Sequence, residues 1–143
     1  MFTLDDCYER GLLRKVRPSA KKAAGSLEQA RIWLHEAHIT LDAGAYRSAL
    51  IAAYMVYFHA ARAILYRDGV REKSDGCILL YLESYAHRGL IDHSWVEIFD
   101  HIMSLRHEDQ YQLGPEPLSG EIESLLEGAP EFIRIMEEFI ATR

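Results

Sequence analysis

The sequence predicts an all-α fold, an antiparallel bundle of four to five helices. Apolar residues recur at helical spacing in several long segments, glycine and proline separate these segments, and no stretch alternates apolar and polar residues as a half-buried strand would. A chain of 143 residues buries one core and is too short for two independent ones. We therefore expect one unit, in which residues 1–25 form a short helix and a basic arm and residues 26–143 form the bundle domain.

Basic residues are concentrated near the N-terminus. Thr3 and Asp6 are spaced as a capping pair for a short first helix, which a segment containing Pro18 then ends. Six of the 16 lysines and arginines follow without an intervening acid: Arg10, Arg14, Lys15, Arg17, Lys21 and Lys22. The net charge of -6 argues against nonspecific coating of nucleic acid. The arm is predicted either to contact RNA or an acidic partner, or to be a solvated and partly mobile segment.

Two long helices open the predicted bundle. Ser26 and Gln29 have the spacing of a capping box, and apolar residues recur at helical spacing from there until Gly44. A second helix is predicted over residues 45–67, with Gly69 as its C-cap. Almost no loop separates the two helices, so we expect them to lie antiparallel.

The remaining sequence predicts three more helices. One covers residues 74–88, and another follows Asp92, which is a good N-cap residue. Glycine and proline mark residues 113–120 as a loop. The last helix is predicted over residues 120–142, with a kink or a division at Pro130.

Residues 49–66 form a nearly continuous apolar run, which raises the question of whether this segment is a transmembrane helix. A span needs roughly 20 apolar residues, and here His59 and Arg62 interrupt the run while alanine and tyrosine outnumber leucine, isoleucine and phenylalanine. We interpret the run as the central helix of a bundle, covered on several sides. The start of the sequence has no secretory signal pattern, so we expect a cytoplasmic protein without membrane contact.

The cysteines and histidines do not form a metal-binding pattern. Cys7 and Cys77 are too few for a disulfide framework and lack paired spacing, so we expect two reduced thiols. His93, Glu97 and His101 are spaced four residues apart, but such a stripe drifts around a helix and is typical of a solvated face. We therefore expect no metal and no cofactor.

The order of motifs resembles the HEPN domain family (higher eukaryote and prokaryote nucleotide-binding). The similar features are GAYRSALIAAY and FHAARAIL in the second bundle helix, a KS turn at Lys73 and Ser74, an arginine followed some residues later by tyrosine, and the late segment APEFI. They extend over residues 26–140. The resemblance implies a helical bundle that forms a homodimer. Many such proteins are metal-independent ribonucleases, often toxins paired with a minimal nucleotidyltransferase, whereas others only bind nucleotides, RNA or protein.

The segment LRHEDQY, residues 105–111, carries the candidate catalytic site. Ribonucleases of the family pair an arginine with a histidine four to six residues later, and two copies meet across the dimer interface. Arg106 fits this arginine, but Tyr111 stands where the histidine is expected. Cleavage through the ribose 2′-hydroxyl needs a base, an acid and a cation, roles that suit histidine and arginine. A tyrosine with its usual pKa is a poor base, although it donates hydrogen bonds and stacks on nucleobases.

His107 is the alternative base, and helix geometry limits it. Neighbouring helical residues point about 100° apart, so Arg106 and His107 diverge, whereas His107 and Tyr111 share a face. Convergence of all three residues requires a two-fold partner or a break at the end of the helix. In the opposing interpretation, residues 106–110 are the solvated last turn of an ordinary helix, where a positive charge is mildly favourable.

Two functional hypotheses follow from these patterns. The first is an RNA-directed homodimer, either a metal-independent ribonuclease or the RNA-binding component of a toxin-antitoxin pair, whose cleft contains Arg106, His107 and Tyr111. The second is a non-catalytic module that docks a partner such as a small nucleotidyltransferase. The tyrosine in place of histidine favours the second, and the basic arm favours the first. His59 and Arg62 either flank the dimer cleft or are an interior histidine and a snorkelling arginine.

Overall fold

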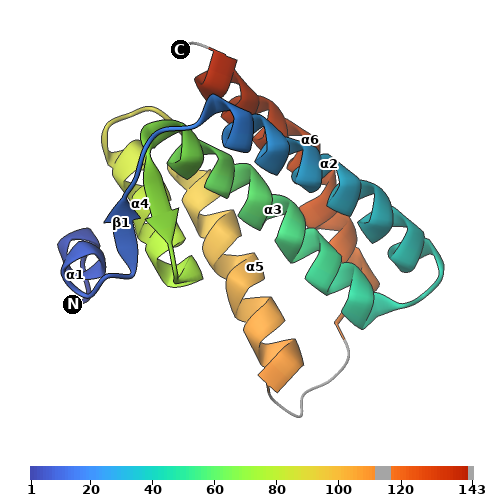
Figure 1. Cartoon of the computed structure of the whole chain (residues 1–143). Helices are drawn as coiled ribbons and strands as arrows, with labels where there is room; N and C mark the ends of the chain where they lie inside the picture. Colours follow the sequence, from blue (N-terminus) through green and yellow to red (C-terminus); the bar gives the residue numbers. More distant parts are fainter. Residues whose placement is uncertain (112–116, 142–143) are drawn as a thin grey trace.

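The computed structural model describes the backbone of residues 1–111 and 117–141 and the side chains of residues 1–108 and 117–141. Helices dominate these ranges and build the core, so the predicted all-α bundle is confirmed (Figure 1). The elements are α1 (Leu4–Glu9), β1 (Leu13–Lys15), α2 (Ala20–Asp42), α3 (Tyr46–Asp68), β2 (Val70–Glu72), α4 (Asp75–His87), α5 (His93–Tyr111) and α6 (Ser119–Ala141).

Helix α3 is the central element of the core. It packs against α2, α5 and α6, and five of its alanines are fully buried: Ala49, Ala53, Ala60, Ala61 and Ala63. Small side chains allow neighbouring helices to approach closely. The helix is long and apolar enough to cross a membrane, but 67% of its most apolar window is buried inside the protein. Burial in the bundle therefore accounts for the apolar run, as the sequence predicted.

Helix α2 begins earlier than the sequence predicted. Its N-cap is Ser19, whose side chain accepts a hydrogen bond from the backbone N–H of Lys22 at 3.0 Å. The prediction that Ser26 caps the helix is wrong. Ser26 lies within α2, its side chain is buried, and its hydroxyl donates a hydrogen bond to the backbone oxygen of His59 at 2.7 Å. A serine hydroxyl with a cross-helix acceptor is satisfied away from a helix end. Sequence spacing does not distinguish that arrangement from a cap.

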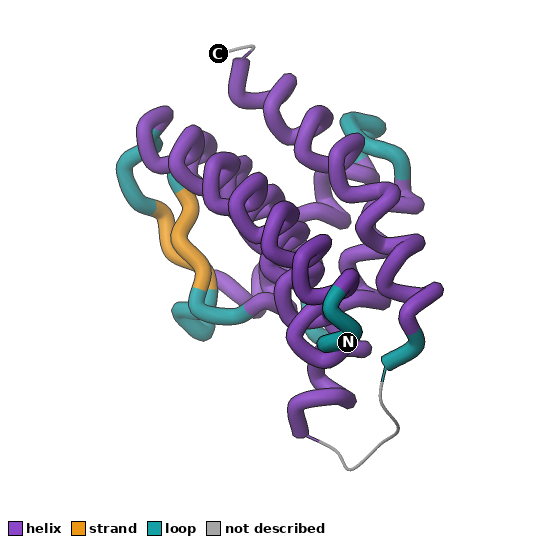
Figure 2. Tube along the Cα trace, turned by 90° about the vertical axis from the view of Figure 1, so that its right-hand side faces the viewer, coloured by secondary structure: helices purple, strands orange, loops and turns teal. Residues whose placement is uncertain are grey.

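A short antiparallel sheet joins the basic arm to the end of α3, although no strand was predicted. Leu13 pairs with Glu72 and Lys15 pairs with Val70, and the pair of strands is visible beside the helices in Figure 2. Three residues are too few to show an alternating pattern. Leu13 is buried, while Arg14 and Lys15 are exposed. This part of the basic arm is therefore an ordered strand with its charges in solvent.

The expectation of two reduced thiols is also wrong for this structure. Cys7 in α1 and Cys77 in α4 form a disulfide, and both residues are buried. They are separated by 70 residues, so the sequence gives no sign that α1 packs against α4. The bond fixes the first helix to the bundle.

The helices after β2 agree with the predicted order. α4 and α5 occupy the expected segments, and the Asp92 side chain accepts a hydrogen bond from the Ser94 backbone N–H at 2.9 Å before α5. Residues 113–116 of the predicted 113–120 loop lie outside the described residues, and the predicted end of the loop is wrong, because Ser119 and Gly120 already belong to α6. Pro130 does not divide the last helix, because α6 runs as one helix from Ser119 to Ala141.

Two glycines with similar backbone angles give a test of this architecture. Gly69 ends α3 with φ 81°, and a β-carbon there would lie 2.6 Å from the backbone oxygen of Val16. Gly44 has φ 78° and open space around it. We expect Gly44→Ala to lower the free energy of unfolding by about 1 kcal/mol and Gly69→Ala by about 2–4 kcal/mol, because the second also forces the arm away. Urea unfolding of both variants measures the difference, and equal losses would contradict the packing of the arm on Gly69.

Candidate functional site

Arg106 lies near the end of α5 and faces the start of α4. Its Nη2 donates to Oδ2 of Asp75 at 3.3 Å, and the centre of its guanidinium group lies 4.3 Å from the centroid of the Tyr54 ring. The Tyr54 hydroxyl donates to the same Asp75 oxygen at 2.8 Å. Three helices therefore contribute one side chain each to a group that we term the Arg106 cluster: Tyr54, Asp75 and Arg106.

The electrostatics of the cluster keep Tyr54 neutral. Burial raises the pKa of the Tyr54 hydroxyl, and the hydrogen bond to Asp75 raises it further, whereas the nearby Arg106 opposes the shift. A phenol with a raised pKa does not act as a general base near neutral pH. Tyr54 therefore acts as a hydrogen-bond donor and as a platform for the guanidinium group.

A cavity of about 350 Å³ opens beside the cluster. Its walls are formed by Asp75, Met103, Ser104, Arg106, His107 and Glu108. Arg106 is only 22% exposed, which restricts its conformation, whereas His107 is on the surface. Although neighbours on a helix diverge, the arginine and the histidine line one cavity, so a ligand in it meets both.

The other residue of the predicted motif is only partly described. Tyr111 is the last residue of α5, but its side chain lies outside the described residues. The structure therefore brings together Arg106 and His107 and leaves the predicted contribution of Tyr111 untested.

His59 and Arg62 lie on α3 and do not line the cavity. Arg62 donates to Glu72 of β2 at 2.9 Å and stacks on the ring of Tyr66, with 5.0 Å from the guanidinium centre to the ring centroid. His59 packs edge-on against Phe58, and burial lowers the pKa of its imidazole, with a smaller contribution from Arg62. In this structure Arg62 connects the central helix to the sheet.

The basic arm is joined through β1 to the strand that precedes α4. Its five candidate contact residues, Arg14, Lys15, Arg17, Lys21 and Lys22, are all exposed. The strand β1 pairs with β2, and β2 leads directly into α4, which begins at Asp75. Glu72 of β2 is close enough to contribute to the raised pKa of Tyr54. The sheet therefore places β1, with the exposed Arg14 and Lys15, beside the segment that leads to Asp75, whereas the arm then continues to Val16, which bonds to Gly69 at the other end of α3.

Two members of the cluster were missed at the sequence level. Asp75 directly follows the predicted start of a helix at Ser74, so it resembles an ordinary acidic residue of a first turn. Tyr54 lies in an apolar run, where an aromatic residue is usually part of the core. A buried tyrosine needs a partner for its hydroxyl, and this requirement was the available signal. The requirement does not indicate which residue is the partner.

The family profile of the HEPN domain matches residues 23–139 of the chain. The chain belongs to the HEPN domain family. The match runs from the first turns of α2 into the last turns of α6, so it includes Tyr54, Asp75 and Arg106. The strand β1 of this HEPN domain lies before the matched segment. No individual curated protein matches the sequence.

The described part of the HEPN domain offers no group of three metal-ligating side chains. His101 belongs to the stripe of His93, Glu97 and His101, which are spaced four residues apart. Its side chain contacts Glu121 of α6, with 3.1 Å between Nε2 and Oε1.

The hydroxyl of Tyr54 can be tested without removing its ring. Tyr54→Phe keeps the platform for Arg106 but deletes the hydrogen bond to Asp75, so we expect a loss of about 1–2 kcal/mol in the free energy of unfolding. The control is Tyr46→Phe, because within the described residues the Tyr46 hydroxyl makes no hydrogen bond. This control should change stability by less than about 0.5 kcal/mol. Equal effects in thermal or urea unfolding would contradict the cluster.

Proposed function

We propose that this HEPN domain acts on RNA as a metal-independent ribonuclease. The observation that carries the proposal is that one cavity is lined both by Arg106, held in place by Asp75 and Tyr54, and by the exposed His107. A guanidinium group matches a phosphate through two parallel hydrogen bonds, and histidine exchanges protons near neutral pH. The two groups are suited to phosphate binding and proton transfer, respectively.

The proposed reaction is a transfer of the phosphodiester to the neighbouring ribose hydroxyl. The imidazole of His107 removes the proton from the 2′-hydroxyl, and the oxygen attacks phosphorus to form a cyclic phosphate. The bond from phosphorus to the 5′-oxygen breaks, and this oxygen receives a proton from an acid. Arg106 stabilises the negative charge that develops on the phosphoryl oxygens. Tyr111, further along α5, is the proposed partner for stacking on a base.

A homodimer would supply the second proton-transfer group. One His107 cannot be both the deprotonated base and the protonated acid at the same moment. Two protomers joined across this face would place a second His107, and a second Arg106, in the same cleft. A two-fold interface brings identical patches together, so each protomer would contribute the same residues.

The arm and the cellular context complete the proposal. The exposed basic side chains of the arm would contact RNA backbone beside the cavity, since phosphate contacts supply sequence-independent affinity. We propose a cytoplasmic protein of a toxin-antitoxin pair, restrained by a minimal nucleotidyltransferase that binds over the candidate cleft.

The second candidate function is a non-catalytic module that docks such a partner. Asp75 favours this alternative, because its carboxylate already offsets the charge of Arg106. A phosphate in the cavity would have to share the guanidinium group with Asp75 or displace it. Tyr111 also favours the alternative, because it stands where ribonucleases of the family have a histidine, and tyrosine is a poor general base.

Cleavage of labelled tRNA and mRNA in EDTA distinguishes the two functions. The wild-type protein should cleave RNA, Arg106→Ala should lower the rate by roughly 10²–10³-fold, and His107→Ala by roughly 10²–10⁴-fold. Arg67→Ala is the matched control for loss of a half-buried, ion-paired arginine, since Arg67 contacts Asp68. His38→Ala controls for loss of an exposed histidine. Both controls should retain activity.

Two results would overturn the enzyme and leave the docking module. One is the absence of cleavage by the partner-free wild type across these RNAs. The other is an activity that persists in Arg106→Ala. Mixing wild type with His107→Ala adds a test of the dimer, because a cleft that uses His107 of both protomers should be inactive in mixed dimers, whereas protomers that act independently would keep the wild-type share of the activity.

The contribution of the arm can be measured through salt dependence. Arg14→Gln/Lys15→Gln should weaken binding of single-stranded RNA and reduce the slope of log K against log salt by about 0.7 for each lost phosphate contact. The control Arg31→Gln/Arg134→Gln removes the same charge from exposed positions on α2 and α6. Equal slopes for the two double variants would show that the arm makes no phosphate contact.

A further inference from the structure

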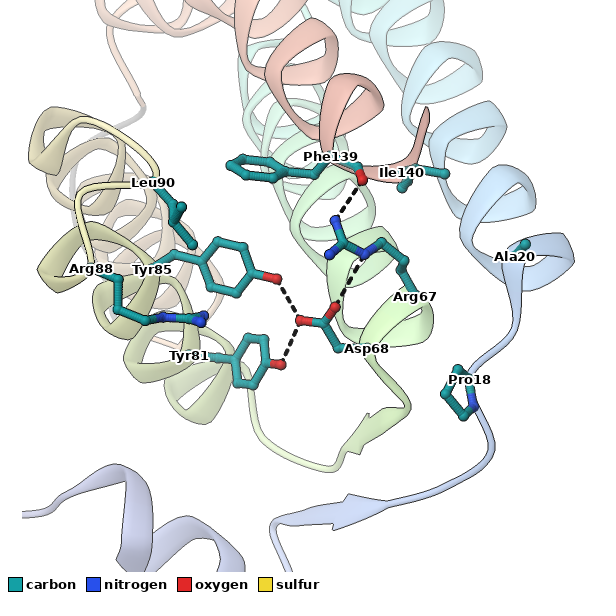
Figure 3. Close-up of a pocket in the computed structure, with 10 residues that line it drawn as sticks. All are labelled: Pro18, Ala20, Arg67, Asp68, Tyr81, Tyr85, Arg88, Leu90, Phe139 and Ile140. Carbon is teal, nitrogen blue, oxygen red and sulfur yellow. Dashed lines mark hydrogen bonds and ion pairs between the residues drawn. The ribbon is translucent and has the colours of Figure 1, made fainter. Parts of the chain in front are cut away.

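A second and larger cavity lies at the other end of α3. Its volume is about 880 Å³, within the range of cavities that hold small molecules. Asp68 at the end of α3 lies in its wall, 14 residues after Tyr54, which corresponds to about 21 Å along a helix. The other walls come from the start of α2, from α4 and the residue after it, and from the end of α6 (Figure 3). This cavity is therefore separate from the Arg106 cluster.

Asp68 organises one side of the cavity. Its Oδ2 accepts hydrogen bonds from the hydroxyls of Tyr81, at 2.7 Å, and Tyr85, while its Oδ1 lies 3.3 Å from Nε of Arg67 (Figure 3). Arg67 in turn donates to the backbone oxygen of Phe139. The negative charge of Asp68 is thus matched by Arg67, and the wall is held by contacts among α3, α4 and α6.

The two tyrosines stay neutral in this arrangement. Burial raises the pKa of both phenols, and the hydrogen bonds to Asp68 raise them further. Their protons are donated to Asp68, so toward a ligand in the cavity their oxygens can act only as hydrogen-bond acceptors.

Arg88 gives the cavity a positive charge that nothing in the wall offsets. Its guanidinium centre lies 4.7 Å from the centroid of the Tyr85 ring (Figure 3). Across residues 1–108 and 117–141, no carboxylate lies within ion-pair distance of Arg88. Leu90, Phe139 and Ile140 contribute apolar surface to the same cavity, and the Phe139 ring meets the Tyr85 ring edge-on, with 5.4 Å between their centroids.

We propose that the cavity binds a small organic anion with one carboxylate and one planar ring. The carboxylate pairs with Arg88, because a guanidinium group donates two parallel hydrogen bonds to a carboxylate. The ring packs against the apolar surface that Leu90, Phe139 and Ile140 contribute to the cavity. Since Arg67 and Asp68 cancel, the cavity has one unmatched positive charge. A dianionic phosphate would bring a surplus negative charge close to Asp68, so a monoanion fits better.

Binding of naphthalene-2-carboxylate to the full chain tests this proposal by calorimetry and by NMR chemical-shift mapping. We expect saturable binding with shifts at Tyr85 and Arg88 and none at the Arg106 cluster. Naphthalene-2-carboxamide, acetate and 2-naphthyl phosphate should each bind at least about tenfold more weakly, because they lack the charge, the ring and the single negative charge, respectively.

Two arginine variants distinguish specific binding at Arg88 from nonspecific electrostatic attraction of the anion to the protein. Arg88→Gln should weaken naphthalene-2-carboxylate binding by at least about tenfold while leaving the fold intact, because its side chain makes no ion pair within the described residues. Arg71→Gln removes an equally exposed arginine from β2 and should bind the probe like the wild type. Absence of saturable binding, equal binding of the carboxamide, or unchanged binding by Arg88→Gln would overturn the proposal.

Discussion

The polar groups of α3 have to find partners inside the protein, because α2, α5 and α6 cover the helix over most of its apolar stretch. Three of these partners come from three different elements. Tyr54 bonds to Asp75 of α4, the Tyr57 hydroxyl donates to the backbone oxygen of Leu125 in α6 at 2.6 Å, and Arg62 pairs with Glu72 of β2. These bonds fix the positions of the surrounding elements relative to the central helix. Both cavities of interest lie where such bonds meet the surface.

The Arg106 cluster shows how this constraint bears on function. Without Tyr54 and Asp75, an arginine near the end of a helix would sample many rotamers and would lose their entropy on binding phosphate. Here two helices restrict it before any ligand arrives. The same contact carries a cost, since Asp75 competes for the guanidinium group. The balance between these effects decides whether the HEPN domain favours the proposed catalysis or partner docking.

The sequence predicted the features that depend on local chemistry. Helical periodicity and the glycine after α3 predicted the bundle, and the resemblance to the HEPN family, rather than local chemistry, pointed to Arg106. The features that it did not predict depend on contacts between distant residues: the pairing of β1 with β2, the bond between Cys7 and Cys77, and the position of Asp75 beside Arg106. A three-residue strand, or an acid in the first turn of a helix, has no distinctive pattern of its own. The partners of these residues become known only from the three-dimensional structure.

The central claim is that Arg106 contacts an RNA phosphate in the cavity beside Asp75. The most direct test is an NMR titration of the isotope-labelled protein with a 2′-O-methylated RNA, which binds but lacks the hydroxyl needed for cleavage. The account predicts that the side-chain Nε–H signal of Arg106 and the ring signals of His107 shift together as the RNA binds, while the Nε–H signal of Arg67 stays in place. Saturable RNA binding that leaves Arg106 and His107 unchanged would contradict it.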